Sequence, residues 1–278
     1  MKTTIIDMGR ESVGKTLFRL ALPSVVSMFF HTLFHLVDTI FISWLGEAPL
    51  AAMSLTFPVM FAAFALFNGI SVGNTSLMSQ ALGAGNSEQG GDMAHTAWWL
   101  VLAISIPPLV LLNRVASGHF FTALGGSGNV LLESYRYNAW LVASFPLMAY
   151  SLVADSLFRS QGDTVTPMVS MLLGNILNAF LDPVFIFSLD LGISGAALAT
   201  LLSRAVSCSY LALRMKAHSH YKLDFSRPSP GFVHRTRLLL AAGLPVSVSQ
   251  GSMALGIGIF NRILSGFGPA AIGAWMLG

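Results

Sequence analysis

Long apolar stretches dominate the sequence and decide what kind of fold it can form. Charged residues make up only 10% of the 278 residues, against about 25% in ordinary soluble domains. Seven stretches reach the roughly 20 residues that a helix needs to cross a bilayer, and an eighth begins near Pro269. They span residues 17–45, 49–82, 94–113, 131–157, 166–189, 193–215 and 236–266. The sequence therefore predicts an all-α polytopic membrane protein.

Short segments rich in glycine, proline and polar residues separate these stretches. They predict turns or loops at 46–49, 83–92, 117–129 and 161–167. The longest polar segment, 217–234, is interpreted as a cytoplasmic linker between two parts of the chain. Residues 1–216 would form an N-terminal transmembrane lobe of six helices, and residues 235–278 would form the start of a C-terminal lobe.

The placement of basic residues predicts the orientation in the membrane. With a cytoplasmic N-terminus, eleven Lys and Arg residues lie in inside segments, and only Arg114 and Arg136 lie outside. This bias predicts a multi-pass protein of the inner (cytoplasmic) membrane. The first apolar stretch is too long for a signal-peptide core, so no cleaved signal is expected. Because the basic residues cluster between apolar stretches, the net charge of +3 does not call for a nucleic-acid partner.

Two narrow polar stripes lie on helix faces inside the apolar stretches. The first consists of Ser24, Ser27, His31, His35 and Asp38. The second consists of Asn175, Asn178 and Asp182. A carboxylate at the centre of a membrane helix costs about 2.5–3.5 kcal/mol and usually marks a substrate or ion site. The stripes therefore predict a membrane cavity built for a cation.

Several side chains of the stripes admit more than one role. The carboxylates of Asp38 and Asp182 could instead pair with Arg204, an arginine inside a nearby apolar stretch. Two close carboxylates in a low dielectric cannot both ionise cheaply, so H⁺ would neutralise the pair and its departure would leave an anion for Na⁺ or an organic cation.

The remaining polar groups are predicted to line the cavity. Ser27, His31, His35 and Asn175 are expected there, with a metal site or a pH-sensitive gate as the alternative for the two histidines. A hydrogen bond between helices is the alternative for Asn175. Pro23 lacks a backbone donor and should bend the first helix. Whether that bend acts in gating is left open.

An internal repeat supports the division of the chain into two parts. Four positions recur at a constant offset of 222, three of them with the same residue: Pro23, Gly46, Ala51 and Ala52 correspond to Pro245, Gly268, Gly273 and Ala274. Transporters are often built from such repeats. The repeat predicts one complete six-helix half followed by the first one to two helices of a second half.

Several separated motifs, in this order, resemble multidrug and toxin extrusion (MATE) transporters. They are Leu20–Pro23, Leu36–Phe41, Gly46, Leu50–Ala52, Gly69–Gly85, Arg159–Pro167, Asn178–Pro183 and Gly192–Thr200. The resemblance implies two six-helix lobes facing a central cleft. It also implies an antiporter, driven by H⁺ or Na⁺ and without another cofactor, that exports cationic or amphiphilic organic compounds such as drugs.

Individual roles follow from the same resemblance. It assigns cation coupling and transport, including any bound Na⁺, to Asp38, Asn178, Asp182 and Thr200, and it matches Pro23 to the proline of the family's first helix. The aspartate at 182 leans toward the DinF-like branch. The chain departs from the family in length, because most of the second lobe is absent, so a missing or separate second lobe is an expected partner.

Other functions remain as alternatives. One is a lipid-linked oligosaccharide flippase of the same superfamily, whose pyrophosphate cargo would call for several basic groups in the cleft. Sparse basic residues inside the apolar stretches and the acidic stripes favour small organic cations instead. The others are an intramembrane enzyme that uses His31, His35 and Asp38, and an inactive half-transporter fragment.

Overall fold

The computed structural model describes residues 13–218 and 230–277, and these residues form helices without any strand. The helices are α1 (Val13–Ser43), α2 (Glu47–Gly83), α3 (Ser87–Ser105), η1 (Pro107–Leu112), α4 (Arg114–Ala123), α5 (Gly128–Ala143), α6 (Phe145–Ser160), α7 (Val165–Pro183), η2 (Val184–Ser188), α8 (Ile193–His218), α9 (Phe232–Leu264), η3 (Ser265–Phe267) and α10 (Pro269–Leu277). The central part of the predicted linker, 219–229, lies outside the described residues.

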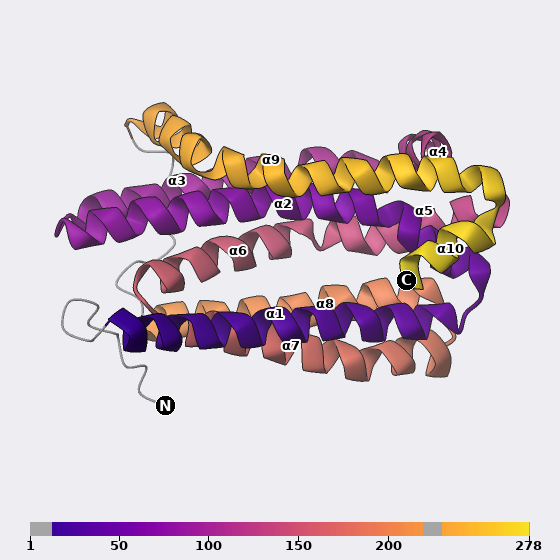
Figure 1. Cartoon of the computed structure of the whole chain (residues 1–278), viewed down its shortest axis with the longest axis horizontal. Helices are drawn as coiled ribbons and strands as arrows, with labels where there is room; N and C mark the ends of the chain where they lie inside the picture. The colour runs from indigo at the N-terminus through magenta and orange to yellow at the C-terminus, as the bar shows by residue number, and fades with distance from the viewer. Residues whose placement is uncertain (1–12, 219–229, 278) are drawn as a thin grey trace.

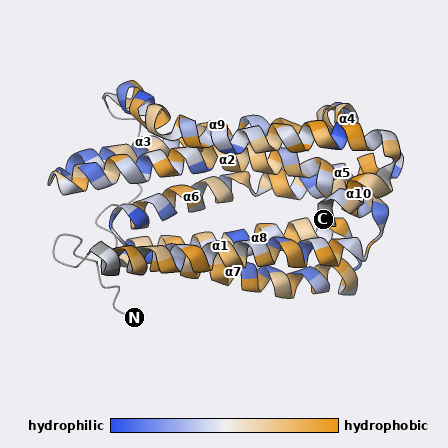
Figure 2. Cartoon of the chain, in the orientation of Figure 1, coloured by the Kyte–Doolittle hydropathy of each residue, from blue (hydrophilic) through white to orange (hydrophobic). Residues whose placement is uncertain are grey.

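The predicted membrane spans are present as helices. Among the described residues, six helices are long and apolar enough to cross a membrane. The α5–α6 pair is bent by 41° and makes a seventh if it counts as one span. Large apolar side chains such as Met28, Phe180 and Leu255 are exposed on the outside of the bundle, where apolar colour covers much of the helices (Figure 2). The prediction of an all-α polytopic membrane protein is confirmed.

The long helices run side by side in two groups (Figure 1). One group contains α1, α7 and α8, and the other contains α2, α3 and α9. The bent pair α5–α6 lies between them, because both of its helices pack against α2 and against α8. Most of the buried apolar core lies around α2, where Phe67 and Leu55 are fully buried. Helices α1, α7 and α8 therefore face α2 and α6 across a cavity that is described in the next section.

Backbone contact joins α9 to α2. A side chain added at Gly73 would place its Cβ 2.8 Å from the carbonyl oxygen of Leu239. A Cβ at Gly243 would collide with the backbone of Gly69. Glycines let membrane helices approach this closely and gain van der Waals contact along their length. Two hydrogen-bonded pairs, Ser54–Asn261 and Asn68–Gln250, add polar contacts to the same interface.

The repeat seen in the sequence has a counterpart in the backbone. Gly46 and Gly268 adopt nearly the same positive φ, 110° and 97°, directly before α2 and α10. L-residues with a side chain rarely adopt such angles, so both turns require glycine. Each glycine follows a long helix that contains a proline, Pro23 in α1 and Pro245 in α9. Both helices continue without interruption through that proline.

Two expected loops are shorter than the sequence suggested. The loop predicted at 83–92 is confined to 84–86, because α3 begins at Ser87. The break predicted at 117–129 contains most of α4. In both places an asparagine caps the helix: Asn86 accepts the backbone N–H of Gln89 at 3.0 Å, and Asn113 accepts those of residues 115 and 116. Polar residues that favour loops also favour the first position of a helix.

Candidate transport site

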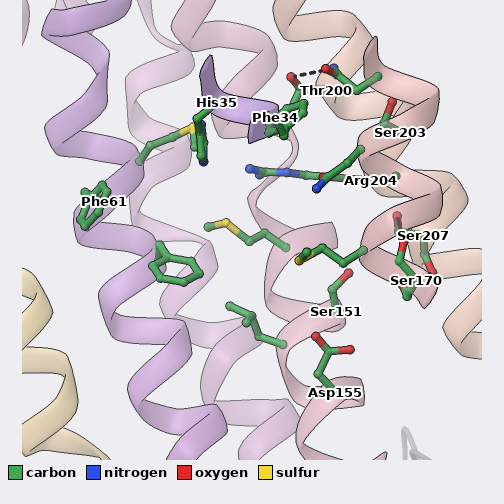
Figure 3. Close-up of a pocket in the computed structure, with 18 of the residues that line it drawn as sticks. Phe34, His35, Phe61, Ser151, Asp155, Ser170, Thr200, Ser203, Arg204 and Ser207 are labelled. Carbon is green, nitrogen blue, oxygen red and sulfur yellow. Dashed lines mark hydrogen bonds between the residues drawn. The ribbon is translucent and has the colours of Figure 1, made fainter. Parts of the chain in front are cut away.

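A cavity of about 240 Å³ lies between α1, α2, α6, α7 and α8 (Figure 3). Its walls are mainly aromatic and sulfur-containing side chains, contributed by Phe34, Phe57, Met60, Phe61, Phe64 and Met171. A few polar and charged groups face the same space, among them His35, Asp155, Asn178, Thr200 and Arg204. Apolar walls with a small number of polar groups are typical of sites for small organic molecules.

A second, smaller cavity of about 20 Å³ adjoins the first. The two cavities share lining residues from three helices, including His35 of α1, Phe57 of α2 and Thr200 of α8. Asp38 lines the smaller cavity together with Tyr137. The polar stripe of α1 therefore leads from the larger cavity to a buried carboxylate.

The four residues predicted to couple cations come together from α1, α7 and α8. Asn178 donates from Nδ2 to the hydroxyl of Thr200 at 3.4 Å, and Thr200 donates to the carbonyl of Ala196 at 3.1 Å. Asp38 and Asp182 are close enough to interact electrostatically with each other and with Tyr137. Asp38 is 4% exposed and Asp182 is fully buried. The aspartate ends of the two polar stripes thus meet in one buried cluster.

Several oxygens of this cluster have no hydrogen-bond partner within the described part of the chain. They are Oδ1 of Asp38, Oδ1 of Asn178 and both carboxylate oxygens of Asp182. A buried carboxylate without a partner is costly, so it favours uptake of a proton or of a cation. Carboxylate and amide oxygens are the ligands that hard cations prefer. The chemistry of the cluster therefore suits H⁺ or Na⁺.

The residues predicted to line the cavity have different surroundings. His35 lines both cavities and packs edge-on against Phe57. Asn175 lines the larger cavity and also donates to the carbonyl of Phe30 at 3.3 Å. Ser27 lines neither of these two cavities, and its hydroxyl donates to the carbonyl of Pro23 at 2.8 Å. The side chain of His31 lies outside the described residues.

The structure also shows a charged group that the sequence reasoning missed, and it shows where Arg204 makes its contact. Asp155 lines the larger cavity, and its Oδ1 has no partner among the described residues. A carboxylate inside the predicted stretch 131–157 was the available signal. Arg204 does not pair with Asp38 or Asp182 in the described structure. It donates from Nη1 to the hydroxyl of Ser144 at 2.8 Å.

Comparison with known proteins identifies the relatives of this arrangement. Residues 23–184 match the family model MatE. An FAD transporter from Shewanella oneidensis is 33% identical over 77% of this chain and 50% of its own. A probable multidrug resistance protein NorM from Thermotoga maritima is 28% identical over 96% of this chain and 58% of its own.

A solved structure has the same fold. It is a MOP superfamily transporter from Pyrococcus furiosus, with a TM-score of 0.82 and 31% identity over 92% of this chain and 56% of that one. The chain thus spans about half to three fifths of the length of these relatives. Because the family model covers more than half of the chain, the chain belongs to the MATE family of multi-pass membrane transporters.

Proposed function

We propose that the chain forms the cation-coupling part of an antiporter that exports amphiphilic organic compounds in exchange for H⁺ or Na⁺. The observation that carries this proposal is the convergence of Asp38, Asn178, Asp182 and Thr200 beside an apolar cavity. Their unpartnered oxygens offer a place for the coupling ion. The neighbouring aromatic walls offer a place for the cargo.

Coupling follows from the shared walls of the two cavities. Each H⁺ or Na⁺ that binds in the acidic cluster cancels one negative charge of the Asp38–Asp182 pair. When the ion leaves, the remaining negative charge acts strongly because the surroundings have a low dielectric. Phe34, His35 and Thr200 line both cavities, so an ion in one changes the surroundings of a compound in the other. The effect is reciprocal, as any coupling between two sites must be.

The proposal extends to the complete transporter. Because the relatives are longer, we propose that a second lobe, in the same or a separate polypeptide, completes the cargo pathway. The N-terminus is proposed to be cytoplasmic and the membrane to be the inner one, on the bias of basic residues. Asp182 supports placement in the DinF-like branch. Asp155 and Arg204 place both signs of charge in the larger cavity, which suits an amphiphilic cargo.

A flippase for lipid-linked oligosaccharides is the weaker candidate. A pyrophosphate cargo would call for several basic groups. Of the described side chains that line the two cavities, Arg204 is the single arginine or lysine.

Ion binding by the purified chain tests the proposal directly. We expect the chain to bind ²²Na⁺, or to take up protons when the pH is lowered, in a way that Asp38→Asn reduces by at least tenfold. Glu47→Gln is the matched control, because Glu47 is an exposed carboxylate in the first turn of α2. Equal ion uptake by the wild type and Asp38→Asn would remove the basis for placing the coupling site here.

A further inference from the structure

Arg204 is a charged group for which cation coupling has no use. It lies on α8, one helical turn after Thr200, and it lines both cavities. Figure 3 shows it in the middle of the larger cavity, between Thr200 and Asp155. Charged residues inside a membrane are costly and usually mark a substrate or ion pathway.

The contacts of Arg204 hold its position without neutralising its charge. Its Nη1 donates to Ser144 Oγ at 2.8 Å. That hydroxyl in turn donates to the carbonyl of Leu141 at 2.6 Å. A guanidinium has five N–H donors, so one hydrogen bond to a neutral hydroxyl satisfies a small part of it. No nitrogen of Arg204 is both fully buried and unpartnered. The other donors are therefore free to reach a molecule in the cavity.

The acidic residues nearby leave this role open. Asp38 shares the smaller cavity with Arg204, and Asp155 shares the larger one. Neither forms an ion pair with it in the described residues. Asp155 instead interacts electrostatically with Arg159, at the end of α6.

The walls around Arg204 suggest the kind of molecule that would pair with it. The rings of Phe34, Phe57, Phe61 and Phe64 line the same cavity. We propose that Arg204 binds the carboxylate of an aromatic organic acid whose ring system lies among these phenylalanines. A planar guanidinium matches a carboxylate with two parallel hydrogen bonds, which adds both affinity and orientation. This inference rests on the proposed transport function, because it names the cargo class of that same cavity.

Equilibrium dialysis with three ligands of one ring system tests the inference. The probes are 2-naphthoate, its neutral amide 2-naphthamide, and the cation 2-naphthylmethylammonium, each mixed with the purified full chain in detergent. We expect the wild type to prefer naphthoate over both others. Arg204→Gln should weaken naphthoate binding at least tenfold and leave naphthamide unchanged, since a hydrogen bond to a charged group is worth more than a neutral one. Arg204→Lys should restore part of the loss.

A second variant separates loss of the Arg204 charge from loss of the fold. Ser144→Ala keeps the charge of Arg204 but removes its hydroxyl contact. It should weaken naphthoate binding less than Arg204→Gln does, and circular dichroism and gel filtration check the fold of each variant. If the variants do not fold, the ligand preference of the wild type still decides the matter.

Three results would overturn the inference: no naphthoate binding by the wild type, equal binding of naphthoate and naphthamide, or unchanged naphthoate binding in a folded Arg204→Gln. Dialysis needs no ion gradient. Failure of cation coupling, measured with Asp38→Asn, is therefore distinguishable from failure of this inference.

Discussion

Replacing Gly243 by alanine tests whether α9 and α2 meet through their backbones. The added Cβ would collide with the carbonyl oxygen of Gly69, and it would lie 2.7 Å from the carbonyl carbon of Gly69 and 3.3 Å from the nitrogen of Ile70. All of these are backbone atoms inside a long helix. Changing a rotamer cannot relieve the contact, so the two helices must separate locally.

The magnitude follows from two opposing contributions. Alanine in place of glycine stabilises a helix interior by about 0.5–1 kcal/mol. Forcing an extra methyl into a well-packed contact costs about 1–3 kcal/mol. Separation would also strain the Ser54–Asn261 hydrogen bonds of the same interface, at 2.7 and 3.1 Å. We expect a net loss of about 1–2 kcal/mol, which lowers Tm by about 2–8 °C for a chain of this size.

Thermal unfolding of the purified chain in detergent, followed by far-UV circular dichroism, measures this loss. Gly251→Ala and Gly256→Ala are matched controls on the same helix, because a Cβ at either position meets no atom within 4 Å. The controls should keep or raise Tm, since they gain helix propensity without a collision. A Gly243→Ala protein that melts together with the controls would refute the backbone contact.

Three further predictions concern the cluster, the interface and the topology. In vesicles that contain the chain with a complete second lobe, Asp182→Asn should weaken H⁺-driven export more than Na⁺-driven export, because an amide oxygen still binds Na⁺ but takes up no proton at working pH; equal losses would contradict this. Asn261→Ala should lower the free energy of unfolding by about 1–3 kcal/mol in chemical denaturation, since it leaves the buried Ser54 hydroxyl without its partner; an unchanged midpoint would refute it. Cysteines placed in 217–234, in a Cys208→Ser background, should react with an impermeant maleimide only in opened cells; labelling of intact cells would reverse the predicted orientation.

Helix faces and mid-span charges could be predicted from the sequence because both are local patterns. Asp38 and Asp182 stand well inside apolar stretches, on stripes with helical spacing. Asp155 obeys the same rule, but it lies two residues from the end of the stretch 131–157, where a charge does not stand out against the polar residues beyond. Its place in the cavity depends on how far the helix extends past its neighbours, which a local pattern does not contain.

The depth of the cavity along α1 and the contact partner of Arg204 could not be predicted, because neither follows from a local pattern. The stripe of α1 indicates which face is polar, but it does not indicate where along that face the cavity ends. Ser27 therefore fell outside both cavities, although it shares a face with His35. The contact of Arg204 with Ser144 depends on the break between α5 and α6, which lies 60 residues earlier in the chain.

The matching turns at Gly46 and Gly268 affect how the chain is made. Each turn takes its shape from its own glycine, so each turn can form as soon as the residues on both sides of it have left the ribosome. Contacts between α1 and α7 must wait, because α7 is synthesised more than a hundred residues after α1. Asp38 therefore enters the bilayer with the first span, before Asp182, which enters with the fifth span.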